Sequence, residues 1–167
     1  RGLKNRPMQQ VEGAEMNIDE ALQTFLAESR ELLTDMESAL LEVEQAQEKT
    51  ELVNAIFRAA HTIKGSSGLF KLDHVVAFTH VVESVLDKVR AGKLNIADEM
   101  VGLLLSCCDH IGALVDGVAA HGTVPDPALQ AQGELLVAEL KIYLISVAGL
   151  STSATLPATT AVDPDLN

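Results

Sequence analysis

The sequence predicts an all-α protein, an antiparallel up-down four-helix bundle with an additional fifth, C-terminal helix. Two observations concern composition: 47% of the 167 residues are apolar, but only 3% are aromatic and none is Trp. A core built from such a chain must be aliphatic. The third observation is that apolar residues recur at the helical period over five long stretches. Short loops between long amphipathic helices make successive helices antiparallel neighbours.

The first helix is expected over residues 17–47. Asn17 and Glu20 have the spacing of a capping box, which marks a helix N-terminus, and apolar residues recur at helical spacing from Ile18 to Val43. Residues 1–16 show no periodic apolar face. We interpret them as a disordered tail or a non-native remnant.

The second and third helices form a hairpin. The second is expected over residues 50–70, with Thr50 able to cap its start. A short turn follows at residues 71–73, and Asp73 is the expected N-cap of the third helix. That helix is expected to end near Gly92, because glycine most easily adopts the left-handed conformation in which many helices end.

The last two helices follow from the same signals. The fourth is expected from Asn95 to His121-Gly122, and the fifth over residues 125–149, with Pro127 suited to the first helical turn. Residues 150–167 are rich in Ser, Thr, Ala and Pro and have no periodic core face. They predict a flexible linker, which leaves residues 17–149 as the helical bundle.

The charge and the cysteines narrow the class of protein. The formal net charge is −12, which argues against nucleic-acid binding, because no basic patch is available to contact phosphates. Cys107 and Cys108 are adjacent within an apolar helical pattern, so they are expected to be core thiols in a reducing compartment. No signal peptide or uninterrupted membrane-spanning run is evident. A cytoplasmic protein without membrane insertion is therefore expected.

One stripe of the second helix carries the candidate chemistry. At 100° per residue, His61, Lys64, Gly65 and Gly68 share a face about 100° away from the apolar face. The stripe combines a nucleophilic imidazole, a cation one turn later and two glycines that permit close approach of another molecule. Each glycine costs about 0.8–1.0 kcal/mol in a helix interior, so the pair needs a compensating role.

The turn near Leu72 predicts which residues of the third helix face this stripe. Antiparallel packing would place Glu83 level with His61, and His80 level with Lys64, to within about one helical turn. A carboxylate that accepts a hydrogen bond from Nδ1–H of an imidazole leaves Nε2 unprotonated and able to attack a phosphoryl group. His61 is therefore a candidate phosphoacceptor. Lys64 would offset the negative charge of an incoming phosphoryl group. His80 joins the site or is only a neighbour.

Two other classes of function compete with this interpretation. A lone surface histidine on a helical bundle is usually unremarkable, so a scaffold whose histidine is never phosphorylated is the alternative. Of the other histidines, His74 and His110 are expected to be partly exposed, and His121 is expected at a helix C-terminus, where its charge suits the helix dipole. Metal binding is poorly supported and no metal site is expected, because no two histidines have i,i+4 spacing and the cysteines are adjacent. No glycine-rich nucleotide-binding motif is present, so we expect this chain to bind no cofactor. We also expect that it does not catalyse a reaction on its own.

The same residues resemble a known family. Residues 55–65 (AIFRAAHTIKG), 79–83 (THVVE) and 25–29 (FLAES) are similar to segments of histidine-containing phosphotransfer (HPt) domains. Within that family the chain is most similar to the phosphotransfer domains of CheA-type chemotaxis kinases, over about residues 17–148. The tail after Ser151 also resembles the linker that follows the domain in such kinases. Thr62 and Ser84 are among the small departures from the family's pattern.

The resemblance implies a two-component phosphorelay. His61 would accept a phosphoryl group at Nε2 from the catalytic domain of a CheA-type kinase and pass it to an aspartate of a CheY-like or CheB-like response regulator. Glu83 would orient the imidazole, Lys64 and His80 would support the site, and Gly65 and Gly68 would form the docking surface. The chain would then be a fragment of a larger histidine kinase, with the phosphoryl group derived from ATP bound elsewhere.

Overall fold

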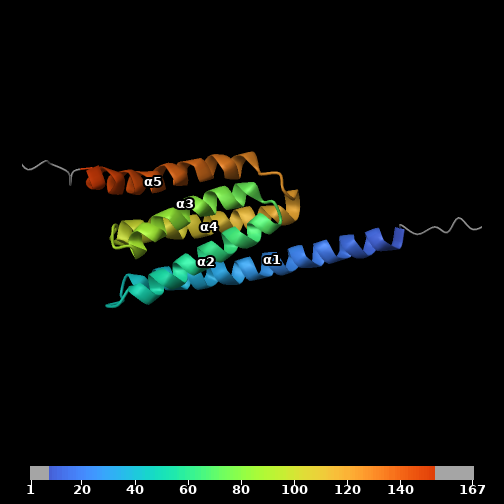
Figure 1. The fold of residues 1–167 in the computed structure, drawn as a ribbon, viewed down its shortest axis with the longest axis horizontal. Coiled ribbons are helices and arrows are strands. Elements are labelled where there is room, and N and C mark those ends of the chain that lie inside the picture. The colour runs from blue at the N-terminus through green and yellow to red at the C-terminus, as the bar shows by residue number, and fades with distance from the viewer. Residues whose placement is uncertain (1–7, 153–167) are drawn as a thin grey trace, which may run out of the picture.

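Five helices make up the part of the chain that the computed structural model describes, residues 8–152 (Figure 1). They are α1 (Met8–Val43), α2 (Thr50–Leu69), α3 (Asp73–Arg90), α4 (Asp98–His121) and α5 (Pro127–Thr152). No strand occurs within these residues. The all-α prediction is therefore confirmed.

The first four helices close a ring around the core. α1 packs on α2 and α4, and α3 packs on α2 and α4, while α5 lies against α3 and α4. Successive helices run in opposite directions, and the N-terminal part of α1 projects beyond the other helices (Figure 1). The arrangement is the predicted antiparallel four-helix bundle with a fifth helix added to one side.

Aliphatic side chains from all five helices fill the interior, as the near absence of aromatic residues requires. Cys107 and Cys108 are buried in α4 as free thiols. Burial raises the pKa of both thiols to about 12, so they stay protonated and behave as small apolar groups. The prediction that they are core thiols is confirmed.

Several helix starts differ from the predicted ones. α1 begins at Met8, so Asn17 and Glu20 lie inside the helix rather than capping it. The residues before Asn17 are mostly good helix formers such as Gln, Glu, Ala and Met, which allow the helix to extend backwards. Asp73 is the first residue of α3 and Leu72 is its cap, and α4 begins at Asp98, three residues after the predicted Asn95.

The predicted division into tail, bundle and linker is changed at both edges. Residues 8–16, assigned to a disordered tail, are helical in α1, and residues 150–152 of the predicted linker belong to α5. Residues 1–7 and 153–167 lie outside the described part of the chain. The tail and linker assignments for those residues stay predictions.

Other local signals are confirmed. Gly92 and Gly122 have φ angles of 70° and 63° after α3 and α4, where glycine avoids the steric cost that a Cβ atom would bring. Pro127 is the first residue of α5. Asp126 caps this helix, since its Oδ1 accepts hydrogen bonds from the backbone N–H groups of Ala128 and Leu129.

α4 is apolar because it is the central core helix. It is long enough, with a mean hydropathy of 1.5 over 18 residues, to cross a membrane by length and composition. However, 56% of that window is buried inside the bundle, and the helix packs against α1, α3 and α5. Core packing therefore accounts for a composition that, taken alone, is also that of a membrane span.

His110 of α4 was predicted to be partly exposed, and this prediction is wrong. Its side chain is 3% exposed, with the Phe78 ring edge-on at a centroid distance of 4.5 Å. A Cβ atom added to Gly133 of α5 would lie 2.6 Å from His110 Nε2. Glycine at this position is thus what allows α5 to pack over the imidazole.

We expect the bundle to lose stability as the pH falls below about 6.5, the ordinary pKa of histidine. Burial lowers the pKa of His110, so the unfolded chain binds a proton more readily than the folded chain and acid favours unfolding. Each unit by which the pKa is lowered corresponds to about 1.4 kcal/mol of unfolding free energy at full effect, or about 3–6 °C in Tm.

Thermal unfolding between pH 7.5 and pH 5.5 measures this effect, with His110→Leu as the test variant and exposed His121→Leu as the control. The pH dependence of Tm should weaken in His110→Leu but not in His121→Leu. His74 contributes in the same direction, because burial lowers its pKa although Asp73 opposes this. An unchanged pH dependence in His110→Leu would contradict the assignment.

Candidate phosphotransfer site

The α2–α3 hairpin brings His61 and Glu83 into contact. His61 Nδ1 and Glu83 Oε1 are 2.8 Å apart, which confirms the level predicted from the position of the turn. Lys71 within that turn has a φ of 56°, which reverses the chain within three residues. A tight turn and antiparallel helices are thus sufficient to pair residues 22 positions apart.

Glu83 accepts the hydrogen bond from the imidazole. Burial raises the pKa of the Glu83 carboxyl, but contacts with Lys64 and His61 outweigh this and lower it below its ordinary value. The carboxyl is therefore ionised near neutral pH and can only accept. In the neutral imidazole of His61 the proton therefore lies on Nδ1, and Nε2 keeps a free lone pair.

The two paired side chains differ in their exposure to solvent. The His61 side chain is 61% exposed, whereas that of Glu83 is only 12% exposed. The imidazole is thus accessible to another protein, while the group that orients it is shielded from water. This shielding strengthens the interaction between the two groups.

Lys64 lies on the opposite oxygen of the same carboxylate. Its Nζ is 2.6 Å from Glu83 Oε2, and its side chain is 23% exposed. The sequence predicted that Lys64 would lie level with His80, which is one helical turn from Glu83. The long lysine side chain instead reaches back to Glu83, so it holds the orienting carboxylate ionised.

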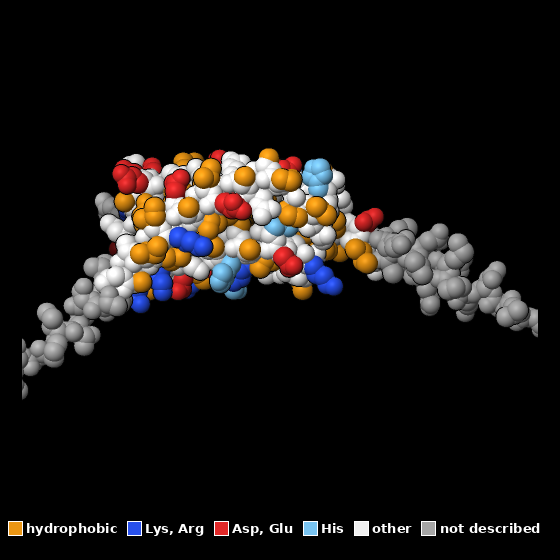
Figure 2. Space-filling model, turned by 90° about the horizontal axis from the view of Figure 1, so that it is seen from above, with side chains coloured by type: hydrophobic (Ala, Val, Ile, Leu, Met, Phe, Trp, Pro, Cys, Tyr) orange, Lys and Arg blue, Asp and Glu red, His pale blue; other side chains and the backbone are white. Residues whose placement is uncertain are grey.

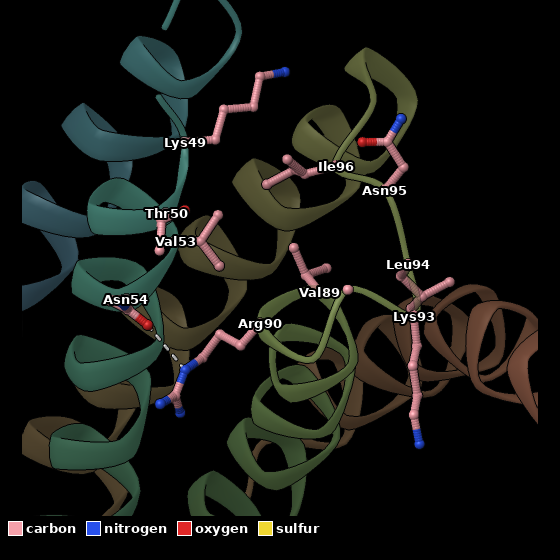
Figure 3. A pocket seen from close by; sticks show the side chains of 11 residues that line it. Lys49, Thr50, Val53, Asn54, Val89, Arg90, Lys93, Leu94, Asn95 and Ile96 are labelled. Atoms are coloured by element: carbon pink, nitrogen blue, oxygen red, sulfur yellow. Dashed lines mark hydrogen bonds between the residues drawn. The ribbon is translucent and has the colours of Figure 1, made fainter. Parts of the chain in front are cut away.

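Phe57 contacts the site, which the sequence did not predict. Its ring stacks on that of His61 with centroids 5.9 Å apart and 12° between the planes. The guanidinium of Arg90 lies 4.0 Å from the Phe57 centroid, and Arg90 Nε donates to Asn54 Oδ1 (Figure 3). The i,i+4 spacing of Phe57 and His61 was the available signal.

Arg90 also borders a hollow of about 560 Å³ between the start of α2 and the end of α3. Lys49 and Lys93 line it too, but their side chains extend away from Arg90 in different directions (Figure 3). The three cations do not converge on a common point. We assign no ligand to this hollow.

His80 is exposed and lines a second hollow, of about 430 Å³, together with Phe57 and Glu83. Its backbone carbonyl accepts a hydrogen bond from Ser84 Oγ. The structure thus brings His80 to the border of the site, one turn from Glu83. Its supporting role stays a prediction.

Gly65 and Gly68 are both exposed, and a Cβ atom added at either would meet no other atom within 4 Å. Internal packing therefore does not require glycine at either position. Leu69, which sequence reasoning missed, is 84% exposed on the same side of α2. An exposed large apolar side chain beside two glycines and an exposed imidazole is typical of a docking surface.

The other described histidines differ in their burial. His74 is partly exposed, as predicted, and His110 is buried. His121 is the last residue of α4, as predicted, and is exposed. Within residues 8–152, no group of three or more His, Cys, Asp or Glu side chains is arranged to hold a metal ion.

Comparison with known proteins agrees with this geometry. The family model described as Hpt domain matches residues 20–120, which include α2, α3 and nearly all of α4. The chain belongs to the Hpt domain family. Hpt domains are histidine phosphotransfer modules, so phosphotransfer is the function of this bundle.

Two curated relatives of this Hpt domain are both chemotaxis proteins CheA. The one from Rhizobium meliloti is 35% identical over 126 residues, covering 75% of this chain and 16% of the relative. The one from Salmonella typhimurium is 34% identical over 146 residues, covering 80% of this chain and 22% of the relative. The Hpt domain thus spans about a fifth or less of the length of these relatives.

Two solved structures share the fold. The phosphorylated P1 domain of CheA3 from R. sphaeroides, solved in complex with CheY6, has a TM-score of 0.63 at 27% identity, covering 73% of this chain and 98% of that one. The CheA phosphotransferase domain from Thermotoga maritima has a TM-score of 0.57 at 33% identity, covering 60% and 95%. The bundle is therefore similar to the P1 domains of CheA.

Proposed function

We propose that His61 is the phosphoacceptor of this Hpt domain and that it relays a phosphoryl group from a kinase to a response regulator. The observation that carries the proposal is the pairing of an exposed imidazole with a shielded, ionised carboxylate. His61 Nδ1 donates to Glu83 Oε1 at 2.8 Å, so the solvent-facing Nε2 is the nucleophile.

The transfer itself is a substitution at phosphorus. The Nε2 lone pair forms the N–P bond while the bond between the γ-phosphorus and its bridging oxygen breaks, and ADP leaves with the electron pair. Imidazole attack leaves positive charge on the ring, which the Glu83 carboxylate stabilises through Nδ1–H. In the second step a regulator aspartate displaces phosphorus from Nε2, and His61 regains its neutral form.

The partners follow from the same chemistry. ATP would be bound by the catalytic domain of a CheA-type kinase, and the chain itself would need no cofactor. The acceptor would be a response regulator of the CheY or CheB type, in line with the R. sphaeroides P1 domain solved with CheY6. Such a relay operates in the cytoplasm, so we place the chain there, within a longer kinase.

Label transfer tests the proposal. The chain is incubated with a CheA-type catalytic domain and γ-labelled ATP, and a CheY-like regulator is then added. We expect label that is stable to base and labile to acid, which distinguishes phosphohistidine from phosphoserine, and that drains to the regulator. If a competent kinase leaves the chain unlabelled, the bundle is a scaffold and the proposal is wrong.

The docking role of Gly65 gives a separate prediction. Gly65→Gln should slow phosphoryl transfer to the regulator by at least about tenfold, because a long side chain would hold the partner away from the α2 backbone. The same change should raise thermal stability, since removing a helix-interior glycine gains roughly 0.5–1 kcal/mol. Stopped-flow transfer rates and thermal unfolding measure the two effects.

Gly102 of α4 provides the matched control. It is also exposed and helical, with no atom within 4 Å of an added Cβ. Gly102→Gln should raise stability similarly but leave transfer unchanged. Equal transfer rates in the two variants would remove Gly65 from the docking surface.

A further inference from the structure

The outward face of α5 carries a row of largely exposed apolar side chains. Leu135, Ile142 and Ile145 are 70%, 66% and 70% exposed. The opposite face packs on α3 and α4 and contains the buried residues Leu140 and Val147. Seen from the α5 side, hydrophobic side chains recur along the length of the molecule (Figure 2).

These residues belong to a regular series. The exposed positions alternate in steps of three and four residues, which is the seam spacing of helices that pack side by side. Three members of the series are large and three are small. The members are Ala128, Ala131, Leu135, Ala138, Ile142 and Ile145.

The order of large and small residues selects how a second identical helix would fit. In an antiparallel pair of α5 helices, Leu135 can lie opposite Ala138 of the other copy. The same alignment puts Ile142 opposite Ala131. It also puts Ile145 opposite Ala128, so every large side chain meets a small one. The helices could then approach closely without voids or clashes.

The charges beside the seam select the same alignment. Glu134 and Lys141 are exposed on one side of the row, and neither forms an ion pair within the part of the chain that the structure describes. In the antiparallel alignment, Glu134 of each copy flanks the seam next to Lys141 of the other. Two symmetric ion pairs would result.

Other alignments are unfavourable in both packing and charge. In a parallel pair, Leu135 would face Leu135 and Ala138 would face Ala138, so layers would alternate between crowded and empty. Glu134 would also lie near Glu139 of the partner. An antiparallel pair shifted by seven residues would bring Lys141 next to Lys141, a like-charge contact.

We propose that the outward face of α5 is a self-association surface on which two copies of this chain pair antiparallel, with Leu135 against Ala138 and Glu134 beside Lys141. The dimer leaves the phosphotransfer site free. Leu144, which borders the hollow beside His61, lies about half a turn away from the seam. A single helix pair is smaller than a standard interface, so the association is weak and depends on concentration.

Sedimentation equilibrium over a roughly hundredfold concentration range tests the proposal. We expect a monomer–dimer equilibrium that weakens as salt is added. Glu134→Lys and Lys141→Glu should each weaken association by about three- to tenfold, because each replaces two attractive pairs by two repulsive ones. The double variant Glu134→Lys/Lys141→Glu should restore it. Ile142→Glu should weaken association by more than about tenfold.

Leu41→Glu is the matched control, since Leu41 is 54% exposed on α1, away from the seam, and should leave association unchanged. A chain that is monomeric throughout the range would overturn the proposal. So would a dimer that Glu134→Lys does not weaken, or a double variant that stays weak. Ile142-dependent sedimentation of a monomeric chain with phosphatidylcholine vesicles would instead identify the face as a lipid contact.

Discussion

Replacing His61 by Gln is expected to abolish phosphoryl uptake, lowering the labelling rate by at least about a thousandfold. The amide nitrogen of Gln has no lone pair available for attack on phosphorus, because that pair is delocalised into the carbonyl. The amide can still hydrogen-bond, so the loss would report the missing nucleophile rather than a disrupted contact. The measurement is incorporation of label from γ-labelled ATP in the presence of a CheA-type catalytic domain.

The variant should keep its fold, which makes the result interpretable. The His61 side chain is 61% exposed, and exposed substitutions away from special features usually change stability by no more than about 0.5 kcal/mol. Far-ultraviolet circular dichroism and thermal unfolding check this. His121→Gln is the matched control, since His121 is an exposed histidine at the end of α4 and has no predicted role in the site. Persistent labelling of His61→Gln would show that another residue is the phosphoacceptor.

Substituting Glu83 should slow uptake without preventing it. Glu83→Ala removes the acceptor that holds the proton on His61 Nδ1 at 2.8 Å, so the ring would sample both tautomers and lose stabilisation of its developing charge. We expect a rate about 10- to 100-fold lower, the range found when groups that orient a functional histidine are removed. The rate constant for labelling at saturating kinase measures the effect.

Glu83→Gln separates charge from hydrogen bonding. It keeps an oxygen acceptor but removes the charge that Lys64 and His61 both stabilise, so its rate should lie between those of the wild type and Glu83→Ala. Ser84→Ala is the control, because Ser84 Oγ donates only to a carbonyl of its own helix. A wild-type rate in Glu83→Ala would remove Glu83 from the mechanism.

The lowered pKa of Glu83 also predicts how the stability of the bundle changes with pH. Because its pKa is lowered in the folded chain, its contribution to stability is complete above its unfolded pKa of about 4.5. It is lost as the pH falls through the lower, folded value. This window lies below that of His110, so the two effects occur in separate pH ranges.

Much of the bundle could be predicted from local sequence. Apolar periodicity located five helices, and residues with strong backbone preferences located several of their ends, such as Gly92, Gly122 and Pro127. The pairing of His61 with Glu83 was also predictable, because a short turn leaves the two arms of a helical hairpin only one antiparallel alignment. In each case the determining interactions lie within a few residues or across one turn.

Tertiary structure decided what depends on packing between distant segments. The sequence did not reveal that Lys64 reaches Glu83, that Arg90 covers Phe57 beside the imidazole, or that His110 is buried beneath α5 at Gly133. Helix starts marked by Asn17 and Asn95 also shifted, since capping preferences of about 1 kcal/mol are small beside the burial of a helix face. A long side chain such as that of Lys64 can reach several partners with similar local free energy. Only the surrounding fold, through burial and neighbouring charge, makes one choice lower in free energy.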